Sequence, residues 1–445
     1  MARLRTRQDG AVTDARTPQI LDLSLRVGEM LLSNGAGAAD VTATMGSIAH
    51  HHGLRQAQVD VTFTSLSISH TDGPEAATFT AARQVTHRET DFDDLTRVDQ
   101  LVSDLLADEI DLDEARSQLA AITSTGHHTP RWAITLAWAV TGAGIALLLG
   151  GYLLVCVLAG LASGGVEIIQ RRLGRLRLPS FYSQIAGGTF VALIAVGAAA
   201  AELPVQPSRV VVTGIVMMLA GLGFIGAFQD ALTGFYVTAC ARLLEVMMST
   251  AGVIAGVALG LTIGHQLGVD VATTATSGLA DLPIATIGGA ITAGGFAFAA
   301  YAPLRSVLPI AAVGAAATAL YVAISERGVD PAWPSGAAAV LIGLLGYGVA
   351  RRVSVPPLVV VTAGIVPLLP GLAIYRGMNQ LADDNYVGLV SLVGAVGAAV
   401  ALSSGVLLGE YVAQPLRREA RRLESRLAGP RLVGPLLART RRKRD

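Results

Sequence analysis

The chain has 445 residues, of which 52% are hydrophobic and 15% are charged, and its formal net charge is zero. Its mean hydropathy is +0.54. A soluble core cannot bury apolar runs of this extent, so the composition predicts a membrane protein with many spans. Lys443 is the only lysine, so no folded part supplies the lysine that a Walker A loop places beside the phosphates of ATP.

No motif in the sequence predicts a cofactor, a metal site or an enzyme. The two cysteines, Cys156 and Cys240, lie in or beside apolar runs and form no thiolate pair. The run His50–His52 places successive side chains in different directions on a helix, so they cannot face one metal. Residues 221–226 match GxGxxG, but they lie within an apolar span and not between a strand and a helix. We therefore expect no cofactor, no metal and no nucleic-acid partner.

Residues 1–130 predict a small cytosolic α+β domain. A helix is expected to start at Thr17–Pro18 and to stop at Asn34–Gly35, and a second one to run from Ala38 to His52. Residues 59–69 are rich in β-branched side chains and predict one strand, with a turn at residues 71–74 and a returning strand at residues 77–85. Two further amphipathic helices are expected at residues 95–105 and 112–122.

From Trp132 onward the sequence predicts an all-α membrane part with ten spans. Most of them approach the roughly 20 residues that cross the hydrocarbon core. The first five form residues 131–265, the second five form residues 280–412, and a basic cytosolic tail follows at 413–445. The predicted spans are Trp132–Leu149, Tyr152–Ile169, Phe181–Ala201, Val210–Phe228, Cys240–Ile263, Leu282–Ala300, Val307–Ile324, Pro334–Ala350, Leu358–Tyr375 and Val387–Tyr411.

Arginine positions predict the orientation in a bacterial plasma membrane. Most loop arginines, and those of the tail, fall on one side if both termini are cytoplasmic, which satisfies the positive-inside rule. An even number of spans is needed for this result. The inner set is Arg171, Arg172, Arg175, Arg177, Arg305, Arg351 and Arg352, and the outer set is Arg209, Arg327 and Arg376.

The ninth predicted span carries Pro367 and Pro370, followed by Gly371 and then Arg376. A helix cannot pass through these prolines without losing backbone hydrogen bonds. In lipid such a break is tolerated where protein or water surrounds it. We therefore expect the segment to be broken and to line a pathway, with Arg376 either binding a carboxylate or marking the outer interface.

A sequence similar to this segment occurs in the fourth predicted span. When Gly214 is aligned with Gly364, GIVMMLAGL falls on GIVPLLPGL. Because each unit holds five spans, the second must enter the membrane from the opposite side, and such inverted repeats place a substrate site at their interface. Chance similarity between two glycine-rich helices remains the alternative. Glycine rows in the fifth and tenth spans predict close helix packing, and contact between these two spans is one hypothesis for the axis of motion.

Charged residues near the spans are candidates for a substrate and proton pathway, since intramembrane charge is costly and usually kept for function. Asp230 follows the fourth span. Arg242 and Glu245 lie one helical turn apart, so they can pair, or Glu245 can take up a proton when the pair opens. Glu167 lies four residues before Arg171 and is expected to pair with it.

Three segments resemble the bacterial threonine/serine exporter family, in its fused form. They are LLSNGAGAADVTATMGSIAHHHGL at Leu31–Leu54, DALTGFYVTACARLLEVMM at Asp230–Met248 and GIVPLLPGLAIYRGM at Gly364–Met378. The resemblance implies a proton-driven exporter of threonine and serine. By this resemblance, the expected site residues are Asp230, Arg242, Glu245, Pro367, Pro370, Gly371 and Arg376. The sequence departs from the family's charged pattern at Ala38–Asp40, which puts a separate activity of the N-terminal domain in question.

Two other functions stay open at this point. The arginines would equally suit a small dicarboxylate exporter, for a substrate such as succinate. The chain could also be a membrane-anchored hydrolase in which Ser65 or Ser67 acts with a histidine, although no triad spacing is present. The sequence leaves a homo-oligomer open as well.

Overall fold

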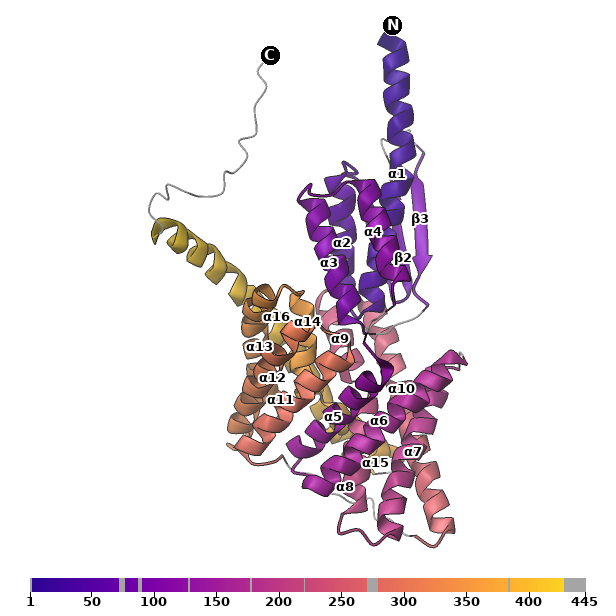
Figure 1. Cartoon of the computed structure of the whole chain (residues 1–445), viewed down its shortest axis with the longest axis vertical. Coiled ribbons are helices and arrows are strands. Elements are labelled where there is room, and N and C mark those ends of the chain that lie inside the picture. Colours follow the sequence, from indigo (N-terminus) through magenta and orange to yellow (C-terminus); the bar gives the residue numbers. More distant parts are fainter. Residues whose placement is uncertain are drawn as a thin grey trace.

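The structure is a computed structural model, and it describes residues 2–71, 77–86, 90–126, 129–176, 178–219, 221–269, 279–382 and 385–427. The expected turn at residues 72–74 and the last part of the basic tail lie outside these residues. The described chain is mostly helical, with a small sheet near its N-terminus (Figure 1).

In the N-terminal region, residues 2–126, two helices pack against a three-stranded antiparallel sheet and two more helices pack on the first two. Its elements are α1 (Ala2–Ser33), α2 (Ala38–His51), β1 (Gln58–Thr62), β2 (Ser65–His70), β3 (Phe79–Gln84), α3 (Phe92–Leu106) and α4 (Leu112–Ser124). The strand order is β1-β2-β3. The apolar stripe of α3 is buried, and Asp91 starts that helix by accepting hydrogen bonds from the N–H groups of Asp93 and Asp94.

Two sequence predictions in this region were wrong. The single strand expected at residues 59–69 is a hairpin, because Thr62 pairs with Ser65 around a two-residue turn. Phe63 adopts φ 51° there, a conformation that turns usually assign to glycine or asparagine, so no turn residue marks it. The helix start expected at Thr17–Pro18 was also wrong, since α1 already begins at Ala2 and runs through Pro18.

The remaining helices form the membrane part. Eight are long and apolar enough to cross a bilayer, and two bent helix pairs raise the number of candidate spans to ten. These elements are α5 (Arg131–Leu148), α6 (Leu153–Arg175), α7 (Ser180–Ala200), α8 (Pro207–Ile215), η1 (Val216–Met218), α9 (Gly221–Leu232), α10 (Tyr236–Gln266), α11 (Leu282–Ala299), α12 (Leu304–Ser325), α13 (Ala332–Val353), α14 (Pro357–Ile365), η2 (Val366–Leu368), α15 (Gly371–Ala382) and α16 (Val387–Leu427). The protein is therefore a multi-pass membrane protein.

Helices α5–α10, here called the first unit, and α11–α16, the second unit, use the same set of packing partners. In the first unit α5 packs on α6, α7 on α10 and α9 on α10. In the second unit α11 packs on α12, α13 on α16 and α15 on α16. Across the units, α5 lies against α11, α9 lies against α16, and α15 lies against α10. The main helix contacts of one unit thus have counterparts in the other.

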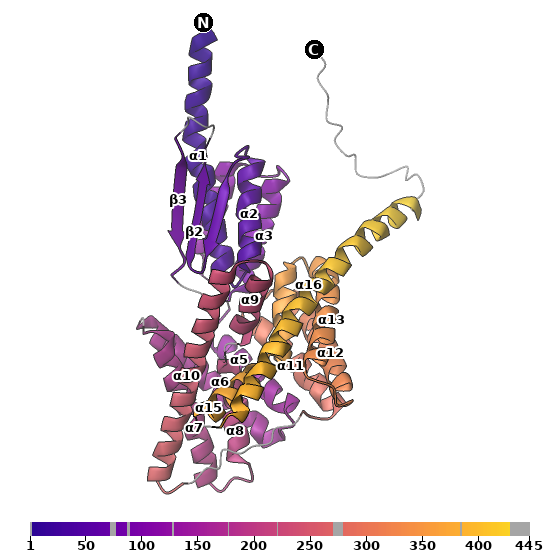
Figure 2. The ribbon, with the colours of Figure 1, turned by 180° about the vertical axis from the view of Figure 1, so that it is seen from behind.

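Corresponding helices run in opposite directions relative to the N-terminal region. Helix α10 begins beside it, where Thr238 accepts a hydrogen bond from the N–H of Phe63. Helix α16 instead ends on that side, where Glu410 interacts electrostatically with Asp40, as its path in Figure 2 also shows.

The glycine rows pack inside each unit. A methyl group on Gly405 would lie 2.6 Å from the carbonyl oxygen of Gly336 in α13, and Gly256 faces the carbonyl of Ile185 in α7 in the same way. The hypothesis that the rows of α10 and α16 contact each other as an axis is therefore wrong. Their role is to bring α10 onto α7 and α16 onto α13.

Candidate functional site

The predicted break in the ninth span is present, and the fourth span is broken in the same way. The α8–η1 segment bends by 44° relative to α9, and the α14–η2 segment bends by 47° relative to α15. Leu219 leaves the helix with φ −71° and ψ 125°, and Leu369 with φ −60° and ψ 131°. The second break has two prolines, whereas the first has none. The shared geometry therefore does not depend on proline alone.

The two breaks meet each other inside the membrane part. A methyl group added to Gly221 would lie 2.9 Å from the Cβ of Leu369, and one added to Gly371 would lie 2.9 Å from the Cβ of Leu219. Each glycine therefore makes room for the leucine of the other break. In each break the glycine follows the leucine by two positions. This reciprocal contact is therefore the one expected at a two-fold axis between the units.

Helices α9 and α15 both begin at this meeting point, at Gly221 and Gly371. Their first-turn N–H groups and the positive ends of their dipoles are consequently close to the same place. Tyr375 in α15 is buried in a cluster with Met218 and Leu219 of the first unit. Arg376 follows it and is partly buried. This geometry can hold an anionic group between the units.

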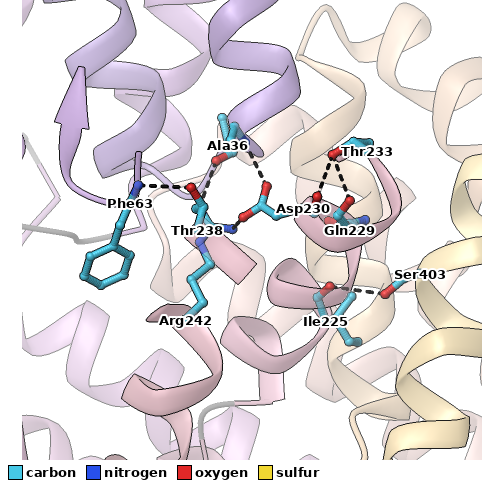
Figure 3. A network of polar contacts seen from close by, with 10 residues as sticks. Ala36, Phe63, Ile225, Gln229, Asp230, Thr233, Thr238, Arg242 and Ser403 are labelled. Atoms are coloured by element: carbon cyan, nitrogen blue, oxygen red, sulfur yellow. Dashed lines mark hydrogen bonds and ion pairs between the residues drawn. The ribbon is translucent and has the colours of Figure 1, made fainter. Parts of the chain in front are cut away.

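A second polar centre lies where the membrane part meets the N-terminal region (Figure 3). Asp230, at the end of α9, has 1% of its surface exposed, and its Oδ2 lies 2.9 Å from Nη1 of Arg242 in α10. Its Oδ1 accepts a hydrogen bond of 2.9 Å from the N–H of Ala38. Nη2 of Arg242 donates to the carbonyl of Ala36 at 3.3 Å. Both charges are thus compensated although they are buried.

Asp230 acts as the N-terminal cap of α2 from another part of the chain. The N-cap position of α2 is Gly37, which has no side chain to accept a hydrogen bond. The carboxylate of Asp230 fills this role and also carries a negative charge to the positive end of the helix. The membrane helices therefore complete an element of the N-terminal region.

The remaining predicted charges are distributed as follows. Arg242 forms an ion pair with Asp230, which the sequence analysis did not predict, and its expected pairing with the exposed Glu245 stays a prediction. The pairing of Glu167 with Arg171 is confirmed at 2.8 Å, and Oγ1 of Thr135 also donates to Glu167 at 2.7 Å. Glu167 therefore joins α6 to α5.

Two acidic residues near this centre were missed by the sequence analysis. Asp40 lies in the first turn of α2, and a methyl group on Gly37 would be 3.7 Å from both an Asp40 oxygen and an Asp230 oxygen. Reduced solvation beside the membrane part, and then the charge of Asp230, raise the pKa of Asp40, although part of the side chain remains exposed. Glu410 of α16 faces Asp40. It is the single charge in the apolar part of the tenth predicted span, and that signal could have identified it.

The serines considered for a hydrolase lie on β2. Among the described residues, no hydrogen bond joins Ser65 or Ser67 to a histidine, and no group of three acidic, histidine or cysteine side chains is arranged to hold a metal.

Comparison with known proteins supplies the family. A model described as "Putative threonine/serine exporter" matches residues 22–264, and one described as "Threonine/Serine exporter, ThrE" matches residues 285–412. A "Probable threonine/serine exporter" of Mycobacterium tuberculosis (strain ATCC 25618 / H37Rv) is 37% identical over 439 residues, which cover 96% of this chain and 83% of that protein. The "Threonine/serine exporter" of Corynebacterium glutamicum is 33% identical over 411 residues, covering 90% of this chain and 84% of that protein.

No solved structure matches the chain. The two family models follow one another along one polypeptide, the first over the N-terminal region and the first unit, the second over the second unit. The chain therefore belongs to the threonine/serine exporter family, in the fused form that carries both membrane units.

Proposed function

We propose that the chain is a secondary-active exporter that couples the efflux of threonine and serine to proton movement across a bacterial plasma membrane. Its relatives carry the name of threonine/serine exporters. The observation that carries the mechanism is the reciprocal contact of the two broken helices, with Gly221 against Leu369 and Gly371 against Leu219. Broken helices that meet at a repeat interface are the usual location of a transporter's substrate site.

The proposal treats the two units as inverted five-span repeats. Matching helix contacts and the opposite directions of α10 and α16 support it. In this arrangement both termini are cytoplasmic, and the N-terminal region forms a cytosolic α+β domain that covers the inner side. The basic tail at 413–445 then falls on the cytoplasmic side, as the positive-inside rule expects.

The substrate is a zwitterion, so its site needs partners for a carboxylate and for an ammonium group. The N-terminal turns of α9 and α15 offer N–H groups to the carboxylate, and Arg376 offers a guanidinium that suits bidentate binding. The turn interrupted by Pro367 and Pro370 leaves carbonyl oxygens outside the helical pattern, and these oxygens accept hydrogen bonds from the ammonium group.

Proton coupling requires acidic groups that change their charge during the cycle. Asp230 is buried against Arg242, so proton uptake there would require that pair to separate. Glu245, exposed one turn further along α10, is the second candidate for this role. Glu167 is held by Arg171 and Thr135 and would join the pathway only if that contact opened.

Vesicles with the purified protein, preloaded with labelled threonine, test the proposal. Efflux is expected to depend on an imposed pH gradient, and excess serine is expected to compete. Arg376→Lys keeps the charge but loses the planar fork, so efflux should fall about tenfold, and Arg376→Gln should abolish it. Arg327→Gln, an exposed position at the end of α12, is the matched control. Efflux without gradient dependence contradicts the proposal, and competition by succinate in place of serine would favour a dicarboxylate exporter.

A further inference from the structure

The N-terminal region is attached to both membrane units on the same side of the molecule. It reaches α9 and α10 of the first unit, and α11 and the residue that follows α13 in the second unit. These two attachments differ in their chemistry, and the difference has a mechanical consequence.

The attachment to the second unit has a buried aromatic contact at Phe92, with polar contacts of Gln100 and Asp40 beside it. Phe92, at the start of α3, has 1% of its surface exposed, and its ring lies 6.1 Å from that of Phe296 in α11, measured between centroids. The N–H of Phe92 donates to the carbonyl of Ala300 at 2.8 Å. The buried apolar cluster of the N-terminal region includes residues of the second unit, and also Phe224, Ile225 and Val246 of the first. Separation at Phe92 would expose its buried ring to water.

The attachment to the first unit is held by polar contacts, which we call the clasp. It consists of the contacts of Asp230 and Arg242 with Ala38 and Ala36, and of the 3.0 Å hydrogen bond from the N–H of Phe63 to Oγ1 of Thr238 (Figure 3). When such contacts open, water replaces each partner, so the net cost of opening is small relative to the strength of the bonds.

We propose that the N-terminal region is a strap across the two units and that the clasp is the end that opens. This inference rests on the proposed function, because alternating access moves the units relative to each other. A packed region cannot follow both units at once. The polar clasp yields while the buried aromatic contact at Phe92 stays closed. Asp230 and Arg242 are, in this view, positioning residues that hold one conformation of the cycle.

A disulfide across the clasp tests whether it must open. Phe63→Cys and Thr238→Cys, with Cys156→Ser and Cys240→Ser, place two thiols at a position where backbone and side chain are already in hydrogen-bond contact. Oxidation is expected to lower efflux at least tenfold, and a reductant should restore it. The control is Asp60→Cys with Ser67→Cys, a cross-strand pair on β1 and β2 that links the sheet but not the clasp. Unchanged efflux with the clasp disulfide formed overturns the proposal.

A second readout does not depend on transport. Hydrogen exchange of the full-length protein in detergent is followed for the peptide at residues 36–41 and for β2. Asp230→Asn is expected to speed exchange in the first peptide about tenfold without changing β2, and Arg327→Gln, at an exposed position just after α12, should resemble the wild type. If no threonine efflux occurs but exchange behaves in this way, the proposed function fails and the clasp stands. Equal exchange of residues 36–41 in wild type and Asp230→Asn refutes the clasp.

Discussion

Gly221→Ala is expected to destabilise the protein because the added methyl group meets Leu369. The new Cβ would lie 2.9 Å from the Cβ, 3.2 Å from the Cδ1 and 3.3 Å from the Cγ of that leucine. Favourable carbon–carbon contacts lie at about 3.5–4.0 Å. Crowding of this kind in a packed core costs about 1–3 kcal/mol.

The sign of the effect makes this substitution informative. Where alanine fits, replacing a helical glycine stabilises a protein by about 0.4–1 kcal/mol, since the unfolded chain loses freedom. Gly394→Ala provides this reference, because nothing lies within 4 Å of the position in α16. A loss at Gly221 together with a gain at Gly394 would show that the neighbour, and not the loss of glycine, decides the outcome.

A compensating change should restore stability in a graded way. Leu369→Ala removes the atoms at 3.2 and 3.3 Å but keeps the Cβ at 2.9 Å, whereas Leu369→Gly removes all three. In the Gly221→Ala background, Leu369→Gly should therefore restore more of the lost stability than Leu369→Ala, with a coupling energy of about 0.5–3 kcal/mol. Leu219→Gly should give no recovery, because Leu219 faces the other glycine.

Unfolding midpoints of the purified variants in detergent, with efflux measured in parallel, give the required energies. The same cycle on Gly371 and Leu219 is expected to mirror the first. Additive effects in both cycles, or recovery of Gly221→Ala by Leu219→Gly, would refute the reciprocal contact and with it the placement of the substrate site.

Three further predictions concern the helix packing and the domain contact. Arg242→Gln leaves a buried carboxylate without its cation and should cost about 3–5 kcal/mol in thermal unfolding, whereas Arg327→Gln at an exposed position should stay within about 0.5 kcal/mol. Reduced solvation and then the charge of Asp230 raise the pKa of Asp40 from 3.8, so its ionised form disfavours the folded state above the raised pKa. Asp40→Asn should therefore raise the unfolding temperature at neutral pH, and this gain should vanish below pH 3.8. Gly405→Ala places a methyl group 2.6 Å from a backbone oxygen that cannot yield, so it should destabilise by about 1–3 kcal/mol, unlike Gly394→Ala.

Local patterns in the sequence were sufficient for the parts of the fold that depend on neighbouring residues. The ten apolar segments, the break at Pro367 and the pair of Glu167 with Arg171 all follow from periodicity, proline chemistry or four-residue spacing. The hairpin turn at Phe63 did not follow, because its residues carry no turn signal and its N–H is held by Thr238 from another part of the chain.

Only the charged residues of the candidate site could be predicted from the sequence, and not the contacts that they make. Asp230 and Arg242 could be singled out as charges near apolar spans, but their partners could not. Spacing along one helix favoured Glu245 for Arg242, whereas the fold of the α9–α10 turn brings Asp230 to it. Asp230 also contacts α2 at Ala38, 192 positions earlier, and Arg242 contacts Ala36 just before that helix. Such contacts depend on tertiary arrangement, which periodicity does not encode.

The two units share their main helix contacts but differ in charge at corresponding positions. The packing of Gly405 on α13 corresponds to that of Gly256 on α7, and the meeting breaks fix the same register for α9 and α15. In this register Asp230 corresponds to Gln380, and Arg242 corresponds to Ser391.

The counterpart pair is also in contact, since Oγ of Ser391 donates to Oε1 of Gln380 at 3.2 Å. The same position in the two units therefore holds a buried ion pair on one side and an uncharged hydrogen bond on the other. Only the ion pair can cap α2 and bind the N-terminal region. In the proposed cycle, the ion pair therefore gives the first unit a contact with the N-terminal region that one conformation keeps and the other loses.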